Sequence, residues 1–409
     1  MLYIDRYSNS IREQYLSMSF WRSLLFLFIL SATTLSYIEG ISKLVILYGL
    51  CFSFLYIIHS LYIRNLRLYP EVMIYFFWVI WCLGGYPVAA SKVQFLEGLR
   101  TVIQIAAMFF VISGQTSGDN KASSTAMMGL LLSGMILAVF SFINGELTVA
   151  AELDTRSRVE SITGNANSFS YQMLITIFAV FYLWTDFRSF SIRVFFVLVT
   201  AISIIGIIYS GSRNGFLSLV AFTFIWYIYS KKKIPKHPIV TYLILILIFT
   251  GIYFFATHLL ENTLLWQRIS QFEDNSSQTR LSLYMEGLGM IKKSPIFGIG
   301  LSNFSVLSKT GLYSHSDYLE VASNTGIIGF IIYFSIYIVL WRRLSLIKKI
   351  TTDSFILYKV NIFKTAILTI LLFGFGKPHI TSKITWIFIA IAVGYTSFVK
   401  SRISHFLKM

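Results

Sequence analysis

The sequence predicts an all-α, polytopic integral membrane protein with about twelve transmembrane helices and one long external loop. Three observations support this fold class. Hydrophobic residues make up 56% of the 409 residues, charged residues make up 13%, and the mean hydropathy is +0.70. Many apolar runs are long enough to cross ~30 Å of hydrocarbon as helices. Alternating segments of about ten residues, which are typical of a transmembrane β-barrel, are absent from the sequence.

The expected spans follow one another along the whole chain, with tryptophans near several of their ends, as is usual at the headgroup level. The spans are approximately 21–38, 43–63, 72–90, 99–114, 124–144, 168–184, 192–209, 215–230, 238–258, 324–341, 355–376 and 384–399. Only the connections 145–167 and 259–323 are long. We expect residues 1–409 to form a single membrane domain, in which the 259–323 loop contains interfacial helices and is too short and mixed for a domain of its own.

The distribution of Lys and Arg sets the orientation. With the N-terminus inside, the inside segments hold nineteen Lys and Arg residues, and the short outside loops hold eight. This asymmetry predicts that both termini are cytoplasmic and that the 259–323 loop lies outside. It also accounts for most of the net charge of +16, so nucleic-acid binding is not expected. The first apolar run, from Trp21, is long enough to span and lacks a small-residue cleavage site, which argues against a cleavable signal peptide.

Two polar stretches on the outer side contain arginines in glycine-rich and serine-rich surroundings. In residues 156–168, Asn167 or Ser168 is expected to cap the next helix; alternatively, that helix start and the two arginines, Arg156 and Arg158, face an anionic group. The second stretch, 210–215, places Arg213 between two glycines at a membrane boundary. Because basic residues are under-represented on the outer side, anion binding is preferred for Arg213 over a role as a membrane anchor.

The long loop contains a predicted interfacial helix after Asn275. Ser276 or Ser277 is a suitable N-cap, and apolar residues alternate with polar ones behind it. Arg280 and Tyr284 share one face of this helix at i, i+4. The following Phe297-Gly-Ile-Gly300 turn lets Asn303 approach a ligand closely.

A further polar stretch, His315 to Glu320, runs into the tenth span. His315 stands near Asp317 and Glu320, which are expected to raise its basicity, and it is therefore a candidate general base. His379 is a weaker candidate for the same site.

Other residues receive structural interpretations. Cys51 and Cys82 lie in apolar runs and are expected to be buried small hydrophobes. Lys359 and Lys364, within or beside the eleventh span, either extend to the interface or face a cavity. No nucleotide-binding or metal-binding motif is present in the sequence, so no cofactor and no metal are expected.

The order of these motifs resembles the O-antigen ligase and O-antigen polymerase family of bacterial membrane glycosyltransferases. The resemblance covers about residues 155–340 and rests on Ser212-Arg213, Arg280, the 294–304 turn and a closing element with His315, Tyr318 and Gly326. Ser316 departs from the family pattern, in which asparagine is usual.

The resemblance implies a donor, an acceptor and residue roles. Members of the family transfer a glycan from an undecaprenyl-diphosphate-linked donor to a sugar hydroxyl at the outer face of the bacterial inner membrane, without metal. Arg213 and Arg280 would bind the diphosphate and His315 would act as the base. Arg158, Tyr284, Asn303, Tyr318 and Glu320 complete the expected binding set. Partners would be the lipid donor, a lipid-linked glycan or lipid A-core acceptor, membrane lipids and a chain-length regulator protein.

Three hypotheses follow for the function. A polymerase, which adds the glycan to another lipid-linked unit, is preferred to a ligase acting on lipid A-core because polymerases occur in more bacteria; no residue supports that choice. Direct attack at the anomeric carbon predicts inversion of configuration. The alternative of another class is a lipid-linked glycan flippase, which predicts charges within the spans along a path. The charges of this sequence gather in the outer loops instead, which favours the enzyme.

Overall fold

The computed structural model describes residues 2–63, 66–144, 159–230 and 275–406. Within these ranges every regular element is a helix, which confirms the predicted all-α class. The elements are α1 (Leu2–Thr33), η1 (Leu35–Tyr37), α2 (Ile41–Tyr62), α3 (Pro70–Leu83), α4 (Lys92–Gly118), α5 (Asn120–Ile143), η2 (Ser161–Thr163), α7 (Ala166–Leu183), α8 (Phe190–Tyr209), α9 (Arg213–Ser230), α12 (Asn275–Lys293), α13 (Phe304–Leu307), α14 (Asp317–Ile350), α15 (Ser354–Phe373) and α16 (Lys383–Phe406).

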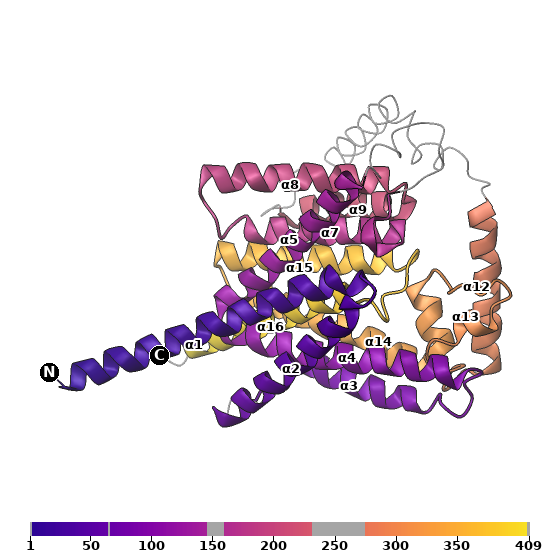
Figure 1. Ribbon diagram of the computed structural model, residues 1–409, viewed down its shortest axis with the longest axis horizontal. Coiled ribbons are helices and arrows are strands. Elements are labelled where there is room, and N and C mark those ends of the chain that lie inside the picture. Colours follow the sequence, from indigo (N-terminus) through magenta and orange to yellow (C-terminus); the bar gives the residue numbers. More distant parts are fainter. Residues whose placement is uncertain (1, 64–65, 145–158, 231–274, 407–409) are drawn as a thin grey trace.

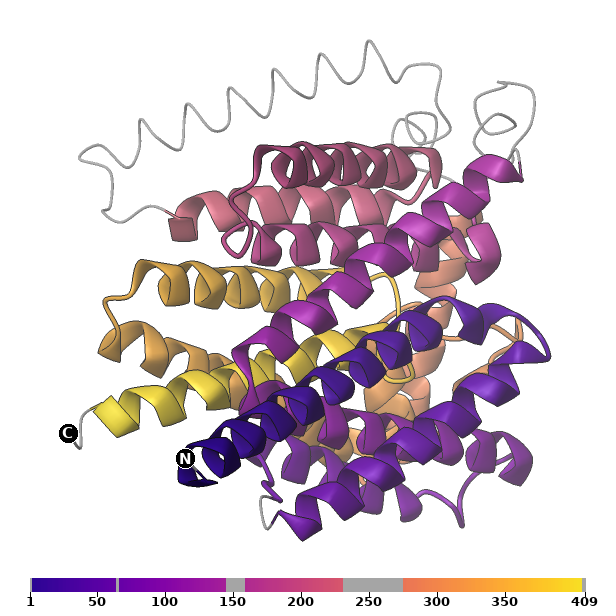
Figure 2. The same cartoon turned by 60° about the vertical axis from the view of Figure 1, so that its left-hand side comes forward.

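The long helices form a bundle whose members run roughly in one direction, as Figures 1 and 2 show. Helices α8 and α9 lie on one side of the bundle, α2 and α3 lie on the opposite side, and α15 and α16 lie between them (Figures 1 and 2). Helix α12 crosses this direction at one end of the bundle, whereas α1 begins and α16 ends at the other (Figure 1). The helix expected after Asn275 is therefore present and oriented across the long helices, while its position at the membrane surface stays a prediction.

Nine described helices are long and apolar enough to cross a membrane. They are α1, α2, α4, α5, α7, α8, α14, α15 and α16. The apolar α3 matches the expected 72–90 span but has only 14 residues, and α9 matches the expected 215–230 span without being among the nine. The expected 238–258 span lies outside the described residues. A multi-pass membrane protein is thus confirmed, while the number twelve stays a prediction.

Burial separates the centre of the bundle from its lipid-facing rim. In the apolar stretch of α7, 89% of the residues are buried inside the protein, against 17% in α2. The buried core is rich in large aromatic side chains, including Trp78, Tyr333 and Trp386. Helix α2 instead exposes leucines and isoleucines along its length, as a helix in contact with lipid must. Helices α7 and α16 thus form the interior against which the outer segments are positioned.

Charged side chains inside the bundle have protein partners. Arg343 of α14 forms an ion pair with Glu71 of α3 (N···O 2.5 Å). Lys359 of α15 forms an ion pair with Asp186 at 2.6 Å. Lys364 donates to Ser345 at 2.8 Å and lies 4.1 Å from the ring centroid of Trp341. The two lysines thus contact neighbouring side chains, in agreement with the tendency of intramembrane charges to pair.

Candidate functional site

The end of the bundle that α12 crosses is organised around residues 374–382, the connection between α15 and α16, which we call the 374–382 loop. The Asp317 backbone N–H donates to the Gly374 carbonyl at 2.7 Å. The Asp317 carboxylate accepts from the backbone N–H groups of His379 at 2.6 Å and Ile380 at 3.1 Å. These bonds fix the start of α14, and with it the preceding His315, against the 374–382 loop.

Two tyrosines predicted to bind substrate connect helices to this region. Tyr284 of α12 donates from its hydroxyl to the carbonyl of Phe375 at 2.8 Å. Tyr318 donates to the carbonyl of Leu371 at 2.7 Å, and its ring stacks on Phe334 at an interplanar angle of 11°. Both hydroxyl protons are committed to backbone acceptors, so these residues hold α12 and α14 in place.

The Ser212-Arg213 turn meets the asparagine-rich segment before α7. Ser212 donates to the side-chain oxygen of Asn167 at 2.8 Å. The N-cap of α7 is Asn165, which accepts from the N–H groups of Asn167 at 2.9 Å and Ser168 at 3.1 Å. The expectation that Asn167 or Ser168 would cap the helix is therefore wrong: Asn165 reaches the N–H groups of the first turn from a position outside the helix.

The same turn also contacts the 374–382 loop. Asn214 donates to the carbonyl of Phe373 at 2.8 Å and packs closely against Gly376. Arg213, the first residue of α9 and partly buried, is thereby placed beside the loop. Arg158 lies outside the described residues.

Asn303 is fully buried and has architectural partners. Its side chain accepts from the Ser91 N–H at 2.7 Å and donates to the carbonyl of Leu301 at 2.8 Å. Its exposed fraction is 0%. Asn303 therefore connects the 294–304 turn to the start of α4 and is not positioned to contact a substrate, contrary to the expectation from its close-approach turn.

His315 occupies a fixed, left-handed turn immediately before α14. Its φ is 56°, a conformation that is uncommon for a residue other than glycine. The Ser314 hydroxyl spans the turn by donating to the Ser316 carbonyl at 2.8 Å. Ser316 is the N-cap of α14. Asparagine, the usual residue of the family at this position, is also a good N-cap, so the substitution preserves the cap.

The electrostatic environment of His315 differs from the expected one. Burial, and to a lesser extent the positive charge of Arg280, lower the pKa of His315 to about 4. The expectation that Asp317 and Glu320 raise its basicity is wrong, because Asp317 is directed to the 374–382 loop and Glu320 accepts from the Ser314 N–H at 2.8 Å. His315 is consequently neutral near pH 7. Among the described residues its buried Nδ1 has no hydrogen-bond partner.

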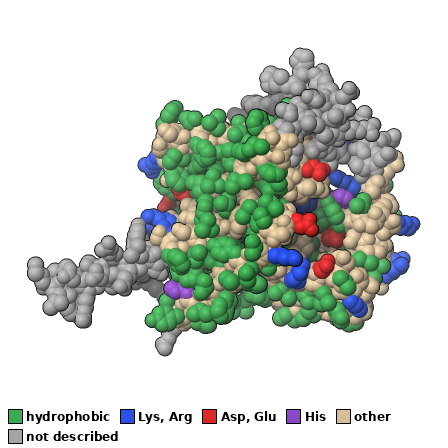
Figure 3. All heavy atoms as spheres, viewed as in Figure 1, with side chains coloured by type: hydrophobic (Ala, Val, Ile, Leu, Met, Phe, Trp, Pro, Cys, Tyr) green, Lys and Arg blue, Asp and Glu red, His purple; other side chains and the backbone are tan. Residues whose placement is uncertain are grey.

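A polar cavity of about 390 Å³ lies next to these segments. Its walls come from α4, the start of α7, the 301–313 segment, α14 and the 374–382 loop. Lys377 and Glu320 contribute the charged groups, and Tyr313 contributes a ring whose centroid is 4.2 Å from that of His315. Figure 3 shows acidic and basic side chains and a histidine around a hollow beside the apolar face. The cavity and the His315 turn are therefore neighbours.

Lys377 is a residue that the sequence analysis did not select. It donates to the Ser168 hydroxyl at 2.8 Å, and burial lowers the pKa of its ammonium group to about 8. The signal that selected Arg213, a basic residue in a short outer loop, applies equally to Lys377. Its place in the cavity depends on the fold of the 374–382 loop, which no local pattern reveals.

His379 has a structural role. Its Nε2 lies 3.2 Å from the carbonyl of Ile370, which can only accept, so Nε2 carries the proton and Nδ1 accepts from Thr385 at 3.1 Å. Burial lowers the pKa of His379 to about 3, and Lys377 contributes in the same direction. Both ring nitrogens are occupied, which excludes this histidine as a base in the present arrangement.

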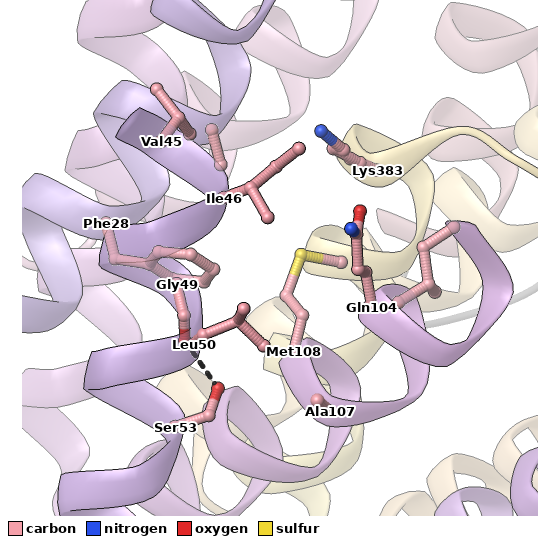
Figure 4. A pocket seen from close by; sticks show the side chains of 12 residues that line it. Phe28, Val45, Ile46, Gly49, Leu50, Ser53, Gln104, Ala107, Met108 and Lys383 are labelled. Atoms are coloured by element: carbon pink, nitrogen blue, oxygen red, sulfur yellow. Dashed lines mark hydrogen bonds between the residues drawn. The ribbon is translucent and has the colours of Figure 1, made fainter. Parts of the chain in front are cut away.

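A second, smaller crevice of about 50 Å³ lies between α1, α2 and α4 (Figure 4). Its walls are mainly apolar, with Gln104 and Lys383 at one end and Ser53, bonded to the carbonyl of Gly49, at the other (Figure 4). A crevice of this size and polarity suits part of a lipid chain and is too small for a sugar.

The comparisons with known proteins concern the segment that contains most of these residues. Residues 196–334 match the family model described as O-antigen ligase. The match includes Arg213, Arg280, His315 and Glu320, and it confirms the predicted family resemblance within residues 196–334; the wider bounds 155–340 stay a prediction. No curated protein sequence matches the chain. The family match supports a membrane glycosyltransferase of O-antigen or polysaccharide assembly; Lys377 lies beyond the matched residues.

Proposed function

We propose, from the match to the O-antigen ligase family and the geometry of the outer end, that the protein is a metal-independent, inverting glycosyltransferase. It transfers a glycan from an undecaprenyl-diphosphate-linked donor to a sugar hydroxyl at the outer face of the inner membrane. The observation that carries the proposal is the pairing of a fixed cation with a neutral histidine. Arg280 lies close enough to His315 to lower the pKa of the imidazole, and within the described residues the Nδ1 of His315 has no hydrogen-bond partner.

The arginines supply the charge that the leaving group requires. A diphosphate that departs from the anomeric carbon takes the bonding electron pair with it, and its negative charge must be stabilised. Arginine stays protonated at any physiological pH and binds phosphate oxygens through two parallel N–H groups. Arg280, and Arg213 beside the 374–382 loop, are proposed for this role.

His315 is proposed to accept the proton of the acceptor hydroxyl. In the transfer, the acceptor oxygen forms a bond to the anomeric carbon, the bond from that carbon to the phosphate oxygen breaks, and the hydroxyl proton moves to Nδ1. A positioned base contributes about 10²–10⁴-fold to such a step. Binding of the anionic diphosphate offsets the charge of Arg280, so the proton affinity of His315 rises when the donor is in place.

Replacement of His315 provides the test. We expect His315→Ala, expressed at normal level, to abolish glycan transfer while the donor lipid accumulates, and Thr310→Ala, in the exposed loop nearby, to retain activity. Arg280→Lys should lower activity because the two-pronged contact with phosphate is lost. Long-chain glycan made at the normal rate by His315→Ala would exclude this mechanism, and an NMR spectrum showing retained configuration in the product would exclude inversion.

We further propose polymerisation as the reaction, with ligation as the alternative. A deletion strain separates them through the glycans on lipid A-core. Single-repeat caps indicate a lost polymerase, whereas a bare core with long polymer kept on the lipid carrier indicates a lost ligase. Transport of the lipid-linked glycan has less support, because Arg343 and Lys359, charged residues inside the described bundle, are paired with Glu71 and Asp186.

A further inference from the structure

We infer that the cavity between α4, α14 and the 374–382 loop is a binding subsite for an uncharged sugar ring, with Lys377 as one of its recognition residues. The inference rests on the proposed function, since it names a part of the substrate that the arginines and His315 do not hold.

The size of the cavity fits a small molecule. A volume of about 390 Å³ lies within the range of roughly 300–1,000 Å³ that is usual for ligand sites. It is far larger than the ~30 Å³ that one water molecule takes up in the liquid. The cavity thus accommodates a polar solute and not merely trapped water.

The lining offers many donors and acceptors and little net charge. Its uncharged polar side chains are the hydroxyls of Ser168, Ser302, Ser305 and Thr381, the amides of Gln94, Asn165 and Asn324, and the phenol of Tyr313. One carboxylate, Glu320, and one ammonium group, Lys377, oppose each other in sign. A diphosphate requires an excess of positive charge, whereas a polyhydroxyl ligand requires alternating donors and acceptors. The composition therefore favours a neutral sugar.

Both charged groups retain hydrogen-bonding capacity. Lys377 has three N–H donors, and within the described residues the ammonium group has one hydrogen bond, to Ser168. Glu320 accepts from Ser314 at 2.8 Å and from Asn324 at 3.0 Å, which leaves further lone pairs on its two oxygens. Because Glu320 is buried and Lys377 is half-buried, hydrogen bonds from sugar hydroxyls would satisfy groups that water reaches less freely than at the surface.

The position of the cavity connects it to the chemistry. Tyr313 lines the cavity, and its ring contacts His315 at a centroid distance of 4.2 Å. A sugar bound there is adjacent to the proposed base, as either the acceptor or the first sugar of the donor requires.

The test narrows the cavity and measures sugar binding directly. Ser305→Phe places a ring in the cavity wall, while Val306→Phe, at the neighbouring exposed position outside the lining, is the matched control. The probe is the lipid-free, phosphate-free repeat-unit oligosaccharide released from the lipid-linked glycan of the same cells, measured by saturation-transfer NMR with the full chain in nanodiscs. We expect Ser305→Phe and Lys377→Met to weaken binding at least tenfold, and Val306→Phe to leave it unchanged.

Other outcomes separate this inference from the proposed function. Arg280→Gln should lose transfer activity but keep oligosaccharide binding. If the wild-type protein and Arg280→Gln both bind the oligosaccharide and the wild-type protein performs no transfer, the subsite is supported and the proposed function is wrong. In the transfer assay, a raised KM for the acceptor alone or for the donor alone in Ser305→Phe identifies which sugar occupies the cavity. Absence of binding to the wild type, equal losses in the two phenylalanine variants, or displacement of the sugar by inorganic diphosphate would overturn the inference.

Discussion

At the scale of single residues, the proton affinity of His315 depends on burial and on the charge of Arg280. Both lower its pKa, to about 4, so the imidazole is neutral over the physiological range. In the free enzyme we expect kcat/KM to fall only as pH approaches 4, where the base becomes protonated. In the donor complex, whose diphosphate offsets the Arg280 charge, the acid limb of kcat should lie at higher pH.

Arg280→Gln tests this electrostatic coupling directly. Removing the positive charge should raise the pKa of His315, which an NMR titration of ring-labelled histidine reports without any need for activity. His315→Asn assigns the resonance. An unchanged titration in Arg280→Gln would mean that burial alone sets the pKa of this histidine.

The second buried histidine makes a prediction about stability. Burial lowers the pKa of His379 from 6.5 to about 3, so between these values the unfolded chain binds a proton that the folded protein does not. The free energy of unfolding should therefore rise with pH through this window. The contribution of neutral His379 is complete above pH 6.5 and is lost as the pH falls toward 3. Thermal unfolding measured from pH 4 upward in detergent checks this. His379→Gln, whatever its absolute stability, should show a smaller slope with pH; an equal slope would assign the effect to other groups.

At the scale of elements, α14 contains a backbone conformation that requires glycine. Gly326 has φ 72° and ψ 177° and interrupts the helical geometry between the outer segment with Asp317 and the long apolar remainder. A Cβ at this position would collide with the carbonyl of Ile296. The Ile327 N–H donates to the Pro295 carbonyl at 2.8 Å, so this break is where the 294–304 turn joins α14.

Gly326→Ala should therefore destabilise the protein and displace the 294–304 turn. The backbone strain alone costs about 1–3 kcal/mol, and the collision adds to it. Gly289→Ala, in α12 with no atom near the added Cβ, is the control and should be neutral or slightly stabilising. Thermal unfolding of the two variants compares them, and equal midpoints would show that the break in α14 is not required.

The sequence predicts elements well where one residue property repeats, and poorly where distant segments meet. The spans and the α12 helix follow from long apolar runs, cap residues and mixed polarity, so their positions were predictable. The 374–382 loop has no such pattern, because its role comes from contacts with Asp317, Tyr284 and Asn214, each far away along the chain. For the same reason the sequence indicated Arg280 and His315 as candidates but not the burial of Asn303 or the role of Lys377 in the cavity.

At the scale of the whole molecule, the two ends of the described chain and the site are on opposite sides. Helix α1 begins and α16 ends at one end of the bundle, and α12 lies across the other (Figure 1). Helices long enough to cross a membrane connect these two ends. One of them, α5, has 24 residues and rises about 1.5 Å per residue. We therefore expect that, in a membrane, the site and the end of α16 face different compartments.

The Lys and Arg asymmetry predicts which compartment each end faces, and cysteine labelling tests it. Ser282→Cys on α12 and Ser401→Cys on α16 are exposed positions at the two ends. Each is introduced after Cys51 and Cys82 are replaced by serine, since Cys51 is exposed, contrary to the expectation that both cysteines are buried. In intact cells with a permeabilised outer envelope, a membrane-impermeant maleimide should label Ser282→Cys, and Ser401→Cys only after the inner membrane is opened. The reverse pattern would place the site in the cytoplasm, where nucleotide-sugar donors become available, and would remove the main reason for a lipid-linked donor.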